Sequence, residues 1–305
     1  MKKNIVLFVS ILLITSCISK PGMINDLKED NLSGKVKSVT EIIYRADTVG
    51  DSIALGEKLN IIVSTYDSSG NKTESSNLNF DSTLNNKVIF RYDHKGHRIE
   101  KRRMRTSENP DYKWSFKYDE KGNIMEEIWL RPDESIDYRI TYKYDEKNNK
   151  TEECAYNPDS TVDYRVTFVF DDKSYVIEEC WYKAGDSLDR KLTYKNDEKG
   201  NKIEESVLKP DGSLYQRRTF AYDEEGNRTE RNSFDAQGKL EHKQTSKYDE
   251  SGNKIADVKI NPDGTFDYEW AFWYEYDSQN NWIKRVDYNN NIPEYISIRE
   301  IEYYK

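Results

Sequence analysis

The chain has 305 residues, with 47 lysines and arginines against 56 aspartates and glutamates. This acidic balance argues against a nucleic-acid partner, because phosphates require a basic footprint on the protein. A charged fraction of 34% and a mean hydropathy of −0.98 are typical of disordered chains, but 23 tyrosines are not. Amphipathic aromatic side chains spread over a thin β-sheet account for both features.

The N-terminus has the pattern of a targeting segment. Lys2 and Lys3 precede the apolar run IVLFVSILLI, which is too short to span a bilayer as a permanent helix. The letters ITSC, residues 14–17, resemble the lipobox of bacterial lipoproteins, and this resemblance implies cleavage before Cys17 and lipidation of that cysteine. We therefore expect a lipoprotein signal peptide over 1–16, the lipidated Cys17 with a polar tether over 17–34, and a repeat domain over 35–305. An ordinary secretory signal with an incidental cysteine is the alternative.

A period of 26 residues runs through the rest of the chain. It is marked by a turn residue that recurs as Gly70, Gly96, Gly122, Asn148, Ser174, Gly200, Gly226 and Gly252, with a last step of 28 to Asn280. An aromatic-Asp pair introduces most of these turns, as in Tyr118-Asp119; the sixth copy has Asn196-Asp197 instead. Nine copies at nearly fixed spacing predict a repeat architecture.

A second turn falls midway in each period, as in NPDS at 157 and NPDG at 261. Proline followed by Asp and Gly or Ser suits hairpin loops of three to five residues with a glycine bulge. The segments between turns alternate: Tyr138, Ile140, Tyr142 and Tyr144 share one face, and Arg139, Thr141 and Lys143 the other. This alternation is typical of half-buried strands. The sequence predicts an all-β fold, a twisted meander of antiparallel hairpins that forms an open curl or a partly closed, barrel-like spiral.

Charged residues also recur in columns. One acidic column comprises Glu126, Glu152, Glu178, Glu204 and Glu230, the next position carries Glu127, Glu153, Glu179 and Glu205, and a basic column comprises Arg139, Arg165, Lys191, Arg217 and Lys243. Opposite charges on neighbouring strands stabilise a sheet, and like charges destabilise it. We therefore predict interleaved acidic and basic ladders that fix the strand register on a hydrated face.

Tandem YD-x-x-G units with interleaved hairpin turns resemble the YD or Rhs repeat family of bacterial envelope and toxin proteins. The resemblance covers about residues 58–288 and implies a spiralling β-sheet. The chain departs from the family in having Asn after the turn glycine, as at Asn123, and in its longer period. It also has fewer units than the large shells that enclose a toxin. Antitoxin-like proteins with MORN-type repeats are a second, weaker resemblance.

Cys154 and Cys180 lie one period apart, and the cell envelope is oxidising. In an antiparallel meander, equivalent strands are two ladder steps apart, about 9.5 Å, which exceeds the reach of a disulfide. In a solenoid with one coil per repeat they would be adjacent. Because the turns favour the meander, we predict two unbridged thiols.

No residue set points to a metal or a cofactor. His94 and His97 are spaced to hold a metal with Asp93, but a zinc site needs three or four convergent ligands, so we interpret them as solvated turn residues. Turns such as DEEGN would hold calcium only weakly. We expect no cofactor.

No catalytic constellation is present either. The glutamate columns suggest acid/base work on sugars, but their repetition favours ladders, because a catalytic pair needs one singular environment. The tryptophans are expected to fill the concave side of the curled sheet. Around the insertion that breaks the period, in YEWAFWYEY, we name Trp270, Trp273, Tyr274 and Trp282 as a candidate binding surface that would stack on sugar rings.

These features predict a noncatalytic binding or scaffolding module, lipid-anchored to the outer membrane of a bacterial envelope, with a glycan or an envelope protein as partner. An immunity or antitoxin-like protein that neutralises a toxin is the alternative, and an enzyme acting on polysaccharide is a third reading. The residues after Cys17, ISKPG, lack an acidic export signal, which favours the periplasmic side.

Overall fold

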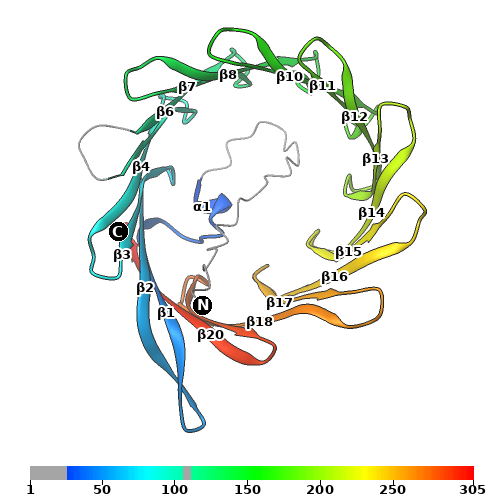
Figure 1. Cartoon of the computed structure of the whole chain (residues 1–305). Helices are drawn as coiled ribbons and strands as arrows, with labels where there is room; N and C mark the ends of the chain where they lie inside the picture. The colour runs from blue at the N-terminus through cyan, green and yellow to red at the C-terminus, as the bar shows by residue number, and fades with distance from the viewer. Residues whose placement is uncertain (1–25, 106–110) are drawn as a thin grey trace, which may run out of the picture.

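The computed structural model describes residues 26–105 and 111–305, and they form one closed barrel of 20 antiparallel strands (Figure 1). A four-residue helix, α1 (Asp26–Glu29), precedes it. The strands are β1 (Val36–Val49), β2 (Ser52–Tyr66), β3 (Lys72–Asn79), β4 (Leu84–Tyr92), β5 (Arg98–Met104), β6 (Tyr112–Tyr118), β7 (Ile124–Leu130), β8 (Ile136–Tyr144), β9 (Lys150–Tyr156), β10 (Val162–Phe170), β11 (Val176–Lys183), β12 (Leu188–Asn196), β13 (Lys202–Leu208), β14 (Leu214–Tyr222), β15 (Arg228–Phe234), β16 (Leu240–Tyr248), β17 (Lys254–Ile260), β18 (Phe266–Tyr276), β19 (Trp282–Asn289) and β20 (Ile292–Tyr303).

Each strand pairs with its neighbours in the sequence, and β1 also pairs with β20, which closes the ring. The predicted all-β meander of hairpins is therefore confirmed. The repeat pattern allowed an open curl or a partly closed spiral, and the sheet closes completely through β1 and β20. Twenty strands about 4.8 Å apart give a ring roughly 30 Å across before any tilt is added, which is wider than side chains fill.

The YD turns have one recurring hydrogen-bond pattern, seen clearly at residues 119–123. Asp119 Oδ1 accepts from the backbone nitrogens of Lys121 (2.9 Å) and Asn123 (2.8 Å), and its Oδ2 accepts from Asn123 Nδ2 (2.8 Å). Gly122 takes a φ of +88°, which favours glycine. The asparagine after the glycine, the departure noted in the sequence, is thus a partner of the turn aspartate.

The tyrosine before most of the turn aspartates ties neighbouring repeats together. The hydroxyl of Tyr118 donates to the carbonyl oxygen of Arg98 (2.8 Å), and Tyr144 donates to Ile124 (2.9 Å). The degenerate copy keeps this link, because Asn196 Nδ2 donates to the carbonyl oxygen of Val176 (2.9 Å). Each bond spans 20 residues, so the column fixes the stacking of successive hairpins.

Residues 26–34, the end of the segment expected as a tether, lie inside the ring at the mouth formed by the YD turns (Figure 1). Leu27 packs with Val36, Val39 and Tyr66 in a small apolar core. Ser33 exchanges two hydrogen bonds with Asn281 beside the closing strands. The N-terminal segment therefore fastens the first repeats to the last, while the predicted signal peptide and Cys17 lie outside the described residues.

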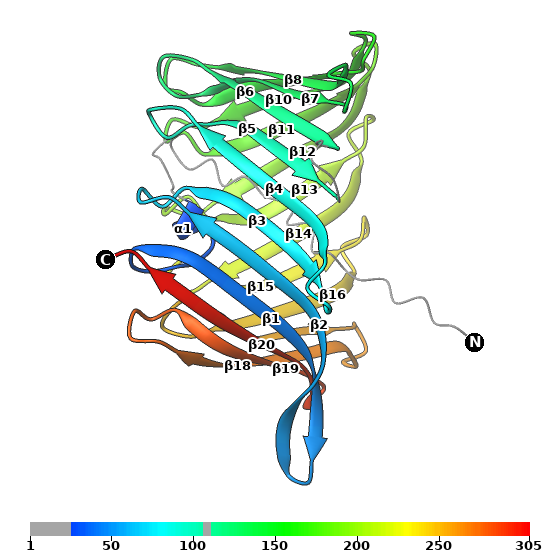
Figure 2. The ribbon, with the colours of Figure 1, turned by 90° about the vertical axis from the view of Figure 1, so that its left-hand side faces the viewer.

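At the opposite mouth the β1–β2 hairpin projects beyond the barrel (Figure 2). Pairing of β1 with β20 reaches Arg45, and pairing of β2 with β3 begins at Asn60, so the ribbon between them pairs only with itself. Within the described residues, none of the helices is long and apolar enough to cross a membrane.

Candidate functional site

Two faces of the barrel wall can be told apart through α1. The helix lies inside the ring, and Tyr92 and Tyr66 donate hydroxyl hydrogen bonds to Asp26 and Asp30, so the tyrosine column faces inward. Side chains alternate along a strand and cross-strand partners share a face. On β8 this alternation places Tyr138, Ile140, Tyr142 and Tyr144 on the inner wall, with their cross-strand partners Trp129, Glu127 and Glu153.

The outer wall carries the predicted ladders. Glu126 binds Arg139 (2.5 Å) and Lys117 (2.6 Å), and the basic column pairs with the first acidic column in the later repeats as well. The bond from Lys191 lowers the pKa of Glu178 despite its partial burial. The basic partners of Glu126 remain partly exposed, with 68% of the Lys117 side chain and 42% of the Arg139 side chain accessible. The ladder prediction is confirmed for the first acidic column.

The second acidic column lies on the inner wall instead, among aromatic side chains. Glu127 accepts from Trp129 Nε1 (2.6 Å) and Glu179 from Trp181 Nε1 (2.5 Å), while Glu153 accepts from the hydroxyl of Tyr164 (2.9 Å). We call this group the acidic wall; it comprises Glu127, Trp129, Tyr142, Glu153, Tyr164, Glu179, Trp181 and Tyr194. The predicted ladder included this column, although two consecutive glutamates in a strand must point to opposite faces.

The rings of the acidic wall also contact one another and nearby cations. Trp129 lies 5.3 Å from Tyr138 between ring centroids, and Tyr164 lies 5.4 Å from Trp181. Lys150 Nζ lies 4.7 Å from the ring centre of Phe168 and 2.8 Å from Glu153. The wall therefore combines flat apolar rings with carboxylate acceptors.

Burial changes the proton affinity of these groups. It raises the pKa of Glu127 above its ordinary value, against the bonds from Trp129 and Tyr142. Burial, followed by the negative charges of Glu127 and Glu153, also raises the pKa of Tyr142. The Tyr142 hydroxyl therefore keeps its proton at neutral pH and acts as a hydrogen-bond donor.

The four aromatic residues named from the sequence do not form one surface. Trp270 and Tyr274 lie on the inner wall, with Asp257 and Arg285 as cross-strand partners. Trp282 is buried, with the Arg299 guanidinium 3.4 Å from its ring centre. Trp273 lies on the opposite face of β18 from Trp270 and Tyr274, on the outer wall, and is 49% exposed. Strand alternation separates Trp273 from the other three, and the ring centroids of Tyr274 and Trp282 lie 6.1 Å apart.

The remaining candidates are structural. His97 Nδ1 lies 3.0 Å from Asp93 Oδ2 and its ring stacks on Tyr118, so His97 occupies the asparagine place of its turn. In the described part of the chain, no cluster of three or more His, Cys, Asp or Glu is placed to hold a metal ion. Cys154 and Cys180 are free thiols on β9 and β11, and β10 lies between them, as the meander requires.

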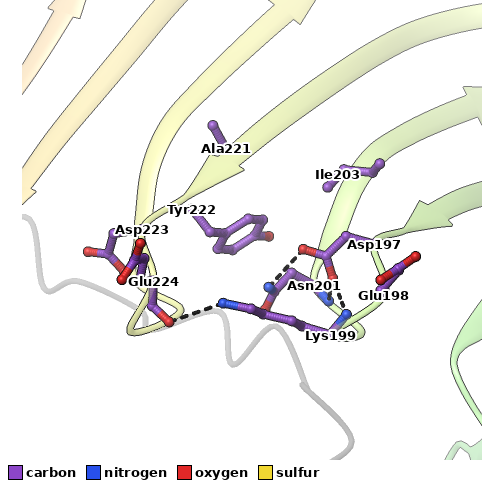
Figure 3. Close-up of a pocket in the computed structure, with 9 residues that line it drawn as sticks. All are labelled: Asp197, Glu198, Lys199, Asn201, Ile203, Ala221, Tyr222, Asp223 and Glu224. Atoms are coloured by element: carbon purple, nitrogen blue, oxygen red, sulfur yellow. Dashed lines mark hydrogen bonds between the residues drawn. The ribbon is translucent and has the colours of Figure 1, made fainter.

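Adjacent YD turns also enclose an open hollow (Figure 3). It lies between the turns at 197–201 and 223–227, where Lys199 Nζ donates to the carbonyl oxygen of Glu224 (3.3 Å). Asp197 and Asn201 are held together by the usual turn bonds. Since its polar groups bond within and between turns, this hollow is part of the repeat scaffold.

Comparison with known proteins gives similarity of structure only. No protein-family model and no curated protein sequence matches the chain. A crystal structure of TcdB2-TccC3 is 13% identical with a TM-score of 0.45, over 84% of this chain and 15% of that one. A porin-like protein from Bacteroides uniformis is 9% identical with a TM-score of 0.36, over 88% of this chain and 98% of that one. A porin-like protein from Bacteroides vulgatus is 11% identical with a TM-score of 0.33, over 63% and 94%.

Proposed function

We propose that the protein is a noncatalytic, lipid-anchored binding module of the bacterial envelope, and that the acidic wall binds a glycan. The observation that carries the proposal is the repetition of tryptophan or tyrosine beside a carboxylate on successive repeats of the inner wall. Flat rings offer stacking surfaces, and carboxylates accept hydrogen bonds from hydroxyl groups.

The geometry of the repeat suits a polymer. Glu127, Glu153 and Glu179 lie on β7, β9 and β11, so equivalent groups recur every second strand, about 9.5 Å apart. A ligand built from repeated units meets the same contacts at each step. The contact between a carboxylate and an aromatic donor recurs along the wall, whereas glycoside hydrolysis requires one pair of carboxyl groups that act as acid and base. We therefore favour binding over turnover.

Anchoring follows from the N-terminal pattern. Leu27, near the start of the described residues, lies at the mouth formed by the YD turns, because its backbone nitrogen donates to the carbonyl oxygen of Gly70 in the first of them. Lipid on Cys17 would hold that mouth near a membrane, with the β1–β2 hairpin on the far side. Replacing Cys17 with Ser should release the protein into the soluble fraction; retention of this variant on membranes would contradict the anchor.

The binding test compares two tryptophans on opposite faces. Trp181→Ala on the inner wall should weaken binding to a panel of bacterial envelope polysaccharides at least about tenfold, while Trp273→Ala on the outer wall leaves it unchanged. Thermal unfolding of both variants verifies that they fold, and Glu179→Gln provides a second inner-wall change of smaller size. Absence of glycan binding, or equal effects of both tryptophan variants, would refute the proposal.

A further inference from the structure

The inner wall changes character abruptly in the repeats over 214–248. The position that carries Glu127, Glu153, Glu179 and Glu205 carries Arg231 in the next copy. The position of Ile140, Val166 and Leu192 carries Arg218, and the position of Tyr138 and Tyr164 carries Arg190, Gln216 and then His242. Two inner-wall columns thus become basic beside a third that is already polar, while the outer ladder continues through Glu230 and Lys243.

Strand register brings these residues together. Ser233 on β15 pairs with Arg218 on β14 and with His242 on β16, and Arg231 on the same face of β15 pairs with Gln244. We call this group, Arg218, Arg231, Ser233 and His242, the basic patch. Its members come from three adjacent strands and share the inner face with Glu205, the cross-strand partner of Arg218.

The charge of Arg231 is uncompensated in the basic patch. Glu205, its nearest acidic neighbour in the register, already binds Lys202 (2.5 Å) and Arg218 (2.6 Å). Among the described residues, no carboxylate forms an ion pair with Arg231. Arg285 on the inner wall is paired, by contrast, with Asp287 (2.6 Å).

The neighbours of Arg231 add to this excess. Burial lowers the pKa of Arg231, and the positive charges of Arg218 and Arg228 lower it further. Burial, with Lys259 and Arg231, likewise lowers the pKa of His242. Half-buried like charges destabilise one another, so an anion placed among them would be held strongly.

A second observation points to a ligand at the same place. Ser233 is completely buried, and its hydroxyl has no hydrogen-bond partner. Buried hydroxyl groups are nearly always satisfied, because an unmade bond costs about 1–3 kcal/mol. The Nε atoms of Arg218 and Arg231 are buried without a partner as well. Three donors therefore stand unused where positive charge is in excess.

We propose that the basic patch binds an oxyanion, with Arg231 as its ionic partner and Ser233 Oγ as a hydrogen-bond donor. A phosphate, sulfate or carboxylate group supplies the several acceptor oxygens that an arginine fork recognises. The site deepens the proposed function and rests on it for the source of the anion. A glycan with an acidic substituent would contact the acidic wall through its sugar rings and the basic patch through its anionic group. Free inorganic phosphate is the other source.

Inorganic phosphate is the first probe, used with the full-length protein and three variants. Calorimetric titration should give saturable binding to the wild type that Arg231→Gln weakens at least about tenfold and Ser233→Ala weakens less. Arg217→Gln, the neighbour of Arg218 on the outer wall, is the matched control and should bind as the wild type does. Arg231→Gln removes an unpaired charge, so it should unfold at an equal or higher temperature without phosphate.

Thermal unfolding in phosphate against chloride, at equal ionic strength, gives the second readout. General salt effects act on all variants alike, so a phosphate shift that is lost only in Arg231→Gln supports the site. Equal shifts in Arg231→Gln and Arg217→Gln, or no saturation of the wild type by about 50 mM phosphate, would overturn it.

Measurements of glycan binding then distinguish the anion site from the proposed glycan-binding function. Binding of phosphate together with failure of every glycan would keep the anion site and refute the proposed function. Binding of neutral and acidic glycans with equal affinity, dependent on Trp181 but not on Arg231, would keep the proposed function and refute the anion site.

Discussion

Glu126 and Glu127 are consecutive on β7, and the same substitution at the two positions should change the free energy of unfolding in opposite directions. Glu126 lies on the outer wall and binds Lys117 and Arg139, both of which are more than 40% exposed. Glu127 lies on the inner wall and accepts from Trp129. Glutamine in either position preserves the shape and removes the charge, so the pair tests which face each glutamate occupies.

The magnitude for Glu126→Gln follows from its two ion pairs. Exposed pairs contribute about 0.2–1 kcal/mol each, so the free energy of unfolding should fall by roughly 0.5–1.5 kcal/mol at pH 7 and by less in high salt. Burial raises the pKa of Glu126, but the bonds from Lys117 and Arg139 outweigh it and hold the pKa below its ordinary value. A lowered folded pKa gives stability that is present above about pH 4.3 and disappears as pH falls through the folded value.

Glu127→Gln has the opposite sign because burial raises the pKa of Glu127. Its ionised form is penalised in the folded state, so the neutral variant should equal or exceed the wild type in stability at pH 7, by up to about 1 kcal/mol. The difference should vanish at about pH 3.5, where the carboxyl is protonated in both states. Urea unfolding of both variants at the two pH values is the assay. Equal losses from both substitutions at pH 7 would refute the assignment of faces.

Two further changes test local parts of the structure. Asp26→Asn should lower the free energy of unfolding by about 1–3 kcal/mol, because Arg98 loses its ionic partner on α1, and hydrogen exchange should speed up at residues 26–34 but not in β10; unchanged exchange would contradict this. Gly200→Ala should destabilise more than Gly226→Ala. Both have positive φ, but a Cβ at Gly200 would meet Tyr175 at 2.4 Å and one at Gly226 would meet nothing within 4 Å. Equal unfolding midpoints would contradict the packing of Tyr175.

Much of the barrel wall was predictable because the turns and strands of each repeat are determined by residues within that repeat. The YD turn needs an aspartate that accepts backbone bonds and a residue of positive φ three positions later, and both can be read from the letters. Glu126 and Arg139 pair because hairpin register follows from loop length. The fold class and the outer ladders therefore follow from features that lie within each repeat and recur along the chain.

Closure and the inner wall depend on relations between distant parts of the chain. Whether β1 meets β20 is set by the accumulated twist and stagger of all strands, which no single repeat encodes. Alternation alone would have placed Trp270 and Trp273 on opposite faces, and would have separated Glu127 from Glu126. The basic patch shows in the sequence as a break in two columns, at Arg218 and Arg231, but its Ser233 becomes notable only when burial is known.

Closure of the ring is the claim on which the inner wall depends, and one cross-link tests it directly. Thr40 on β1 and Glu300 on β20 are cross-strand partners, within reach of a disulfide if both become cysteine. Thr40→Cys with Glu204→Cys, a residue on β13, is the control. The closed barrel predicts a bridge between positions 40 and 300, seen as one linked peptide in non-reducing mass spectrometry, and none in the control. If no bridge forms between positions 40 and 300 under oxidising conditions, the two strands are not adjacent, which would contradict the closed barrel.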